Sequence, residues 1–140
     1  MLERPWHMAA QSFEINIDEV KKAMTIAEVS RKFGLSADTL RYYERIGLIP
    51  AVPRAKNGIR DYDENSCRWI ELMKCLRAAG VRIETLVKYV ALFEQGDETA
   101  AARKALLEEQ RDRLTAHIAQ MQQSLDRLSS KIEHDDELLR

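Results

Sequence analysis

Glycine, proline and cysteine are scarce in this chain of 140 residues, which holds five glycines, three prolines and two cysteines. So few turn-forming residues argue against a β-sandwich or a glycine-rich nucleotide-binding fold. Hydrophobic residues make up 45% of the chain and charged residues 32%. This composition is typical of a globular protein with a helical lean rather than of a disordered chain. We therefore expect a mainly α-helical protein.

The two cysteines, Cys67 and Cys75, are too few for a disulfide framework and form no CxxC pair. On one helix, a rise of about 1.5 Å per residue separates them by about 12 Å, whereas a disulfide needs Cα atoms within about 7 Å. We expect reduced thiols and a cytoplasmic protein. The sequence also lacks an apolar run of the roughly 18 residues that a membrane span needs, and residues 1–11 lack a signal peptide's apolar core.

An excess of charge of one sign is also missing, because the net charge is −1 and the isoelectric point is about 6.3. That mean argues against nucleic-acid binding. The charges are segregated, however. Residues 24–62 hold seven basic and four acidic side chains, which makes this stretch net +3, while residues 98–140 are net −2. This segregation makes residues 24–62 a candidate for nucleic-acid binding, despite the neutral mean charge of the chain.

Residues 25–45 carry the signals of two short helices joined by a tight turn. Thr25 and Glu28 have the spacing of a capping box, and Gly34 is placed to end the first helix. Ser36 is an N-cap candidate for a second helix that runs to about Arg45. This arrangement predicts a helix-turn-helix.

A basic hairpin is predicted next, because Asn57-Gly58 lies between two extended segments and is typical of a two-residue turn with positive φ. Asp63 is the expected N-cap of a helix through Ala79, and a further helix is expected over Ile83 to Phe93.

From Thr99 to Leu139 the chain has neither glycine nor proline, which predicts one helix of about 40 residues. Its apolar side chains recur in steps of four and three, the pattern of a coiled-coil seam. A lone helix cannot bury so narrow a stripe, so we expect a homodimer; packing of this helix on its own domain is the alternative. The proposed dimerisation residues are Leu107, Leu114, Ile118, Met121, Leu125, Leu128 and Ile132, with Arg111 and Asp135 at seam-equivalent positions near the ends.

The segment MTIAEVSRKFGLSADTLRYYERIGLIP, followed by GIRDYDE, resembles the MerR family of transcription regulators. The resemblance covers all but the leader, residues 1–23, and is greatest to the small thiol-responsive AdhR/NmlR-like branch. It implies a winged helix-turn-helix DNA-binding domain over residues 24–93 and an antiparallel coiled-coil dimer through residues 98–139. It further implies binding to an inverted repeat in a promoter with a long spacer, and distortion of that DNA for RNA polymerase.

Seven residues are predicted to contact DNA. The hydroxyls of Thr39 and Tyr42 can bind phosphate, and Arg41 can bind phosphate or a guanine edge. Hairpin cations can probe the groove or the phosphate backbone, and a solubilising loop is the alternative. The resemblance adds Tyr62, for which packing under the hairpin is the alternative. The remaining predicted contacts are the hairpin cations Arg54, Lys56 and Arg60.

Three residues of the second helix are expected to have structural roles. Leu40 and Tyr43 are expected to lie in the core. Glu44 is expected to form an ion pair, for which Arg45 is the nearest candidate.

The resemblance implies that Cys75 senses an inducer through an electrophile or oxidation. Arg68, Lys74 and Arg77 lie close to it in sequence, and nearby cations lower a thiol pKa. A buried, inert cysteine is the alternative. Cys67 is expected to be a surface or packing thiol.

Other classes of function fit less well. A metal sensor would need several cysteines in or after the long helix, but residues 76–140 contain none, so no metal or other cofactor is expected. A thiol enzyme lacks a nearby general base, and a coiled-coil adaptor leaves the basic head without a role. We expect the leader, residues 1–23, to be native or added, since Met24 is a natural second start. Its residues 13–20 are predicted to form a short strand or part of a marginal helix that runs to Lys22. We expect no separate effector domain in a chain of this length.

Overall fold

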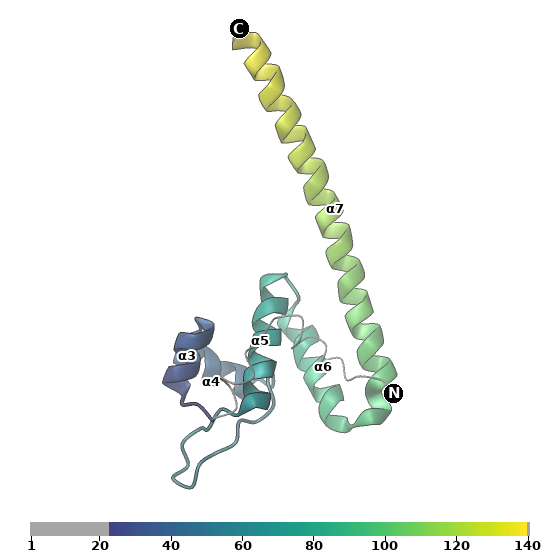
Figure 1. The fold of residues 1–140 in the computed structure, drawn as a ribbon. Coiled ribbons are helices and arrows are strands. Elements are labelled where there is room, and N and C mark those ends of the chain that lie inside the picture. Colours follow the sequence, from purple (N-terminus) through teal and green to yellow (C-terminus); the bar gives the residue numbers. More distant parts are fainter. Residues whose placement is uncertain (1–22, 140) are drawn as a thin grey trace. The chain divides into compact units, whose positions relative to one another are not determined.

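The computed structural model describes residues 23–139, which form a chain of helices (Figure 1). The strand or helix expected over residues 13–20 lies outside the described residues. Two compact units are distinguished, of which the first ends at Lys104 and the second begins at Ala105. The mainly helical architecture with a long C-terminal helix is confirmed. The elements are α3 (Ile26–Phe33), α4 (Ala37–Arg45), α5 (Glu64–Ala78), α6 (Ile83–Gln95), the 3₁₀ helix η1 (Asp97–Thr99) and α7 (Ala100–Leu139).

Helices α3 and α4 begin at the predicted caps. The Thr25 hydroxyl accepts a hydrogen bond from the Glu28 N–H at 3.2 Å, and the Glu28 carboxylate accepts one from the Thr25 N–H at 3.1 Å. Gly34 ends α3 with φ at +66°, a left-handed conformation that glycine adopts without strain. Ser36 then caps α4 by accepting a hydrogen bond from the Thr39 N–H at 3.0 Å. The predicted helix-turn-helix is confirmed.

The predicted hairpin is present as a basic loop between α4 and α5, here called the wing (residues 54–60) (Figure 1). Arg54 and Arg60 form an isolated antiparallel bridge across it. Its turn differs in detail from the prediction. The Gly58 N–H donates to the Ala55 carbonyl at 2.9 Å, and the Ala55 N–H donates to the Ile59 carbonyl at 2.9 Å. The loop therefore contains three residues, with Gly58 (φ +83°) in its last position.

Helix α5 begins at the predicted cap, Asp63, whose carboxylate accepts a hydrogen bond from the Ser66 N–H at 2.8 Å. Its buried residues join side chains from the neighbouring segments to form the core of the first unit. Helices α3, α4, α5 and α6 and residues 48–52 contribute to this core, which holds the helix-turn-helix and the base of the wing in place. Among the most buried side chains are Val29, Leu40, Leu48, Ile49, Ile70, Met73 and Leu86.

A buried arginine closes the first unit. Arg103 is only 4% exposed, its Nε donates to the Thr99 hydroxyl at 3.0 Å, and its guanidinium stacks on the Phe93 ring at 5.1 Å. Thr99 in turn donates to the Leu92 carbonyl at 2.6 Å. These contacts tie the first turn of α7 to α6, so the compact unit runs to Lys104 and includes more than the predicted domain over residues 24–93.

In the second unit, α7 presents an apolar stripe along one side of the helix. Leu107 and Leu114 are half-buried, whereas the five seam residues that follow are 54–60% exposed. A stripe of this size exposed to water is typical of an interaction surface. Within residues 23–139, no helix is long and apolar enough to span a membrane. The five exposed seam residues are Ile118, Met121, Leu125, Leu128 and Ile132.

Candidate nucleic-acid interface

Helix α4 has a buried side and a polar side. Leu40 and Tyr43 are buried, as predicted, while Arg41, Tyr42 and Arg45 are exposed. The Arg45 guanidinium lies 5.3 Å from the centre of the Tyr42 ring, a cation–π contact that orients both side chains. The exposed side of α4 therefore carries two cations and a phenol hydroxyl within about one helical turn.

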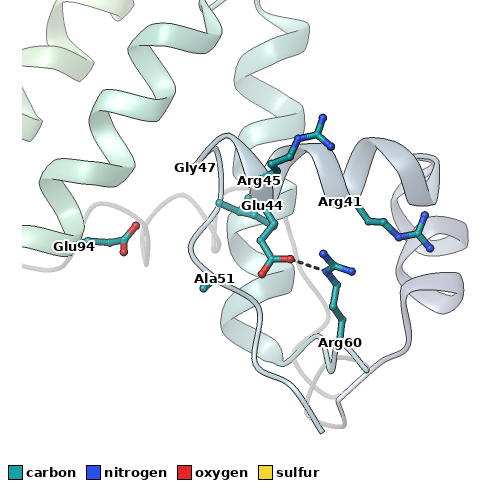
Figure 2. A pocket seen from close by; sticks show the side chains of 8 residues that line it. Arg41, Glu44, Arg45, Gly47, Ala51, Arg60 and Glu94 are labelled. Atoms are coloured by element: carbon teal, nitrogen blue, oxygen red, sulfur yellow. Dashed lines mark hydrogen bonds and ion pairs between the residues drawn. The ribbon is translucent and has the colours of Figure 1, made fainter. Parts of the chain in front are cut away.

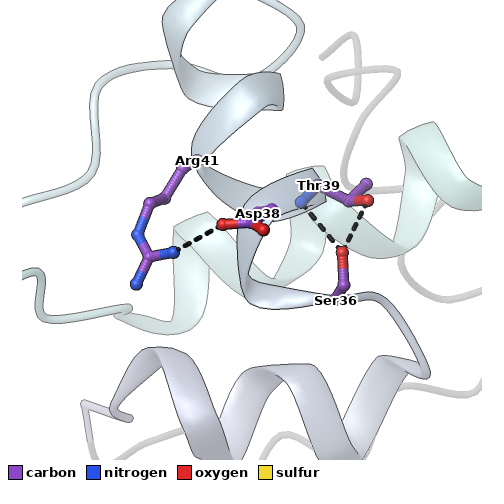
Figure 3. A network of polar contacts seen from close by, with 4 residues as sticks. All are labelled: Ser36, Asp38, Thr39 and Arg41. Carbon is purple, nitrogen blue, oxygen red and sulfur yellow. Dashed lines mark hydrogen bonds and ion pairs between the residues drawn. The ribbon is translucent and has the colours of Figure 1, made fainter.

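The N-terminal turn of α4 is held by side-chain contacts (Figure 3). The Ser36 hydroxyl donates to the Thr39 hydroxyl at 2.8 Å, in addition to accepting from the Thr39 N–H. Asp38 pairs with Arg41 at 3.0 Å, but the two side chains are 97% and 47% exposed. Exposed ion pairs contribute little, so Arg41 can exchange Asp38 for a phosphate or a base edge.

Glu44 joins α4 to the wing (Figure 2). One carboxylate oxygen accepts a hydrogen bond from Arg60 Nε at 2.6 Å, and the other accepts one from the Val52 N–H at 2.9 Å. Burial alone would raise the pKa of Glu44, but these hydrogen bonds and the charge of Arg60 outweigh it, so the pKa lies below its usual value. The prediction that Glu44 is a structural ion-pair partner is confirmed, and its partner is Arg60 instead of Arg45.

A hollow of about 570 Å³ lies beside this contact (Figure 2). Its charged lining residues combine three arginines with two glutamates, one of which, Glu94, comes from α6. Cations from α4 and from the wing therefore share one surface of the first unit, although they are far apart in the sequence. The lining residues are Arg41, Glu44, Arg45, Gly47, Ile49, Ala51, Arg60 and Glu94.

The tip of the wing adds two more predicted contacts. Arg54 donates to the Gly58 carbonyl at 3.0 Å, so it fixes the loop as well as carrying charge, and Lys56 is exposed. Ile59, which follows Gly58 in the wing, is 59% exposed. Sequence reasoning missed Ile59, because a single apolar residue in a polar loop has no periodic pattern.

Tyr62 lies in the core of the first unit. Its side chain is 0% exposed, and its hydroxyl has no hydrogen-bond partner among the described residues. Burial raises the pKa of this phenol. The backbone of Tyr62 pairs with Met24 through hydrogen bonds of 2.8 and 2.9 Å, which directs the ring into the core. Full burial of the ring favours the alternative of packing under the wing over the predicted contact between Tyr62 and DNA.

The environment of Cys75 corrects the prediction that nearby cations lower the pKa of its thiol. Cys75 is half-buried, and burial together with the charge of Glu71 raises its thiol pKa, whereas nearby cations were expected to lower it. The reason is the orientation of two cations. Arg68 forms an ion pair with Glu64, and Arg77 donates to the Val81 carbonyl at 2.8 Å.

Cys67 is fully buried, and burial raises its thiol pKa to about 11. It is a packing residue, one of the two roles predicted for it. Over residues 23–139, no group of three or more histidine, cysteine or acidic side chains is placed to hold a metal ion.

The interface belongs to a winged helix-turn-helix protein, and comparisons with known proteins are consistent with this class. Residues 24–92 match the family described as MerR HTH family regulatory protein, and residues 67–131 match the one described as MerR, DNA binding. The HTH-type transcriptional regulator AdhR of Bacillus subtilis is 59% identical over 81 residues, which are 58% of this chain and 58% of AdhR. The match thus spans less than two thirds of that relative.

Two solved structures match over more of their length. A MerR family transcriptional regulator from Listeria monocytogenes has a TM-score of 0.79 and 48% identity, covering 81% of this chain and 86% of that one. HiNmlR, a MerR family regulator lacking the sensor domain and bound to promoter DNA, has a TM-score of 0.74 and 32% identity, covering 79% of this chain and 87% of that one.

The chain belongs to the MerR family of regulatory proteins. Its similarity to AdhR and HiNmlR agrees with the branch that the sequence resembles. These families and relatives are regulators and not enzymes, as predicted.

Proposed function

We propose that this protein is a cytoplasmic transcriptional regulator that binds an inverted repeat in promoter DNA and acts there with RNA polymerase. The observation that carries the proposal is the shared surface of α4 and the wing, where Arg41, Arg45 and Arg60 come together. The crystal structure of HiNmlR with promoter DNA supports it, because that relative has the same fold.

In this proposal α4 enters the major groove, whose width admits one α-helix. Arg41 and Thr39 lie on its first turns, where recognition helices contact base edges and phosphates. The wing then follows the phosphate backbone with Arg54 and Lys56, while Arg60 remains fixed by Glu44. Charge supplies affinity at this surface, and the rigid link between α4 and the wing supplies register.

A homodimer formed through α7 would supply two heads for the two halves of an inverted repeat. The five exposed seam residues of α7 support this proposal, because a second copy would remove them from water. The family resemblance further implies that the bound dimer bends and untwists a long promoter spacer, a deformation that the additional contacts would offset.

Binding to DNA fragments that contain the inverted repeat upstream of the gene tests the proposal. The expected result is a dimer that binds the repeat far more tightly than scrambled DNA, with affinity falling steeply as salt rises. Equal affinity for both DNAs would contradict sequence-specific regulation. Absence of any salt-sensitive binding would favour the coiled-coil adaptor.

We further propose that Cys75 senses an electrophile such as a reactive aldehyde. The Cys75 sulfur adds to the carbonyl carbon while the thiol proton passes through solvent to the carbonyl oxygen, and the resulting thiohemiacetal reverts when the aldehyde is removed. The partial exposure of Cys75 supports access by a small molecule. Because the raised thiol pKa leaves only a small fraction as thiolate at neutral pH, the reaction requires a strong electrophile.

The variant Cys75→Ser tests this role. It should bind the operator like the wild type and fail to respond to an added aldehyde in a transcription assay with purified RNA polymerase. Cys67→Ser is the matched control and should still respond. An unchanged response in Cys75→Ser would make Cys75 structural and point to another inducer.

A further inference from the structure

We propose that two copies of this chain pair through α7 in one antiparallel register centred on Gln123, fixed by reciprocal ion pairs between Arg111 and the partner's Asp135. This inference rests on the proposed homodimer and on the antiparallel orientation that the family resemblance implies, and it adds the register and the ion pairs that fix it. It is drawn from the spacing of the seam, from the two charges within it and from the charge of each half of the helix.

The seam of α7 reads the same in both directions. Its positions, including Arg111, Asp135 and Leu139, follow one another in alternating steps of four and three residues. Reversal of the helix about Gln123 places every seam position opposite another seam position, as an antiparallel coiled coil requires. The apolar layers are then Leu107 with the partner's Leu139, Leu114 with the partner's Ile132, Ile118 with the partner's Leu128, and Met121 with the partner's Leu125.

The same reversal brings Arg111 opposite the partner's Asp135, and the twofold symmetry repeats this pair at the other end. Arg111 and Asp135 are the charged positions within this stripe, and they have opposite signs. A parallel pair would instead place Arg111 beside the partner's Arg111 and Asp135 beside the partner's Asp135. Like charges at facing positions disfavour that orientation.

A shift of one heptad is disfavoured as well. In one direction it would set Arg111 against the partner's Leu128, and in the other it would set Asp135 against the partner's Ile118. Either shift faces a charged side chain with an apolar one and leaves seam positions at one end of the helix without a facing seam residue. The centred register avoids both costs.

The charges of the two halves of α7 also favour antiparallel pairing. Residues 100–119 carry four basic and three acidic side chains, whereas residues 120–139 carry two basic and five acidic ones. Antiparallel pairing sets the net positive half of each helix against the net negative half of the other. Parallel pairing would set the two negative halves together.

Both charged seam residues can exchange their present partners. Arg111 contacts Asp112 at 3.2 Å, and Asp135 contacts Lys131 at 3.1 Å, with all four side chains more than half exposed. Exposed pairs of neighbouring residues contribute little to stability. Neither contact therefore prevents an ion pair between copies.

Charge reversal in the full-length protein tests the register, with the dimer dissociation constant measured by sedimentation equilibrium at low salt. Arg111→Glu and Asp135→Lys should each weaken the dimer about tenfold or more, because two attractive pairs become repulsive. The double variant, which restores opposite charges, should dimerise nearly like the wild type. A parallel dimer would leave all three variants unchanged, since like charges would face each other in every case.

Reversal of charges outside the seam, Arg113→Glu with Asp126→Lys, is the matched control and should leave the dissociation constant nearly unchanged. Circular dichroism verifies that each variant keeps its helix. A monomeric wild type would contradict the homodimer itself. A dimer in which single reversals have no effect, or in which the double variant is not restored, would contradict the register alone.

Discussion

Glu44, in the last turn of α4, accepts a hydrogen bond of 2.6 Å from Arg60, which follows the tip of the wing. Its second oxygen holds the Val52 N–H at 2.9 Å. A carboxylate beside a DNA-binding surface repels phosphate, so its presence there calls for a physical reason. The reason we infer is position: through Arg60, Glu44 fixes the wing relative to α4, and thereby fixes where the cations at the tip of the wing lie.

Glu44→Gln separates this positioning role from simple electrostatics. If Glu44 acted only through its negative charge, removal of that charge would strengthen DNA binding. Loss of the Arg60 contact should instead weaken binding to the inverted repeat by about tenfold. Hydrogen bonds to charged groups contribute about 1.5–3 kcal/mol. Fluorescence anisotropy with labelled operator DNA measures the change, and a thermal melt shows that the variant remains folded at the assay temperature.

Glu94→Gln is the matched control, since Glu94 lines the same hollow from α6 and is exposed. It removes the same charge without touching the wing, so affinity should stay equal or rise slightly. Equal effects of Glu44→Gln and Glu94→Gln on affinity would contradict the positioning role of Glu44.

The pKa of Glu44 adds a dependence on pH. Since the folded pKa is below its usual value, the stability that this carboxylate contributes is present above the unfolded pKa, near 4.5, and is lost as the pH falls through the folded pKa. At neutral pH the contact with Arg60 is fully formed.

Lys56 and Arg54 should affect binding in different ways. Lys56→Ala removes one exposed cation, so the slope of log affinity against log salt should fall in magnitude by about 0.9 if Lys56 contacts one phosphate. Arg54→Ala also removes the hydrogen bond to the Gly58 carbonyl, so it should weaken specific binding further by loosening the wing.

Titrations at several salt concentrations measure both variants, with Lys88→Ala on α6 as a control outside α4 and the wing. An unchanged salt slope in Lys56→Ala would mean that the tip of the wing does not meet phosphate.

Local features of the fold were predictable, because each depends on residues close together in the sequence. Thr25 with Glu28, Ser36 and Asp63 begin helices through hydrogen bonds to residues three positions away. The unbroken helix from Ala100 follows from the absence of glycine and proline. These signals were enough to place α4 and the wing in one domain.

The side-chain partners at the site were not predictable in the same way. Glu44 is closer in sequence to Arg45, but the fold brings Arg60, sixteen residues away, to its carboxylate. Sequence proximity also placed cations beside Cys75, whereas Arg77 turns toward the Val81 carbonyl and Glu71 acts on the thiol. Side-chain direction depends on packing, which the linear order of charges does not contain.

Tyr62→Phe tests the packing role of this residue. The hydroxyl is buried without a hydrogen-bond partner in the described part of the chain, so its removal should leave the free energy of unfolding equal or raise it by up to about 1 kcal/mol. Operator affinity should change less than twofold, because the ring remains in the core. Chemical denaturation and anisotropy measure the two effects. A loss of affinity in a fully stable variant would instead place the hydroxyl on DNA.

Cys75 should react with an alkylating reagent faster than Cys67 in the folded protein, and its rate should rise with pH. Cys75 is partly exposed and its thiol pKa is raised, so the thiolate fraction grows between about pH 7 and pH 9. Cys67 is fully buried with a pKa of about 11 and should react only when the protein unfolds. Mass spectrometry of peptides after timed iodoacetamide treatment gives both rates. Glu71→Gln should raise the rate at Cys75 near neutral pH, since it removes the charge that disfavours the thiolate. A Cys75 rate that is already constant at pH 7 would show that the thiol is ionised there and would contradict this electrostatic account.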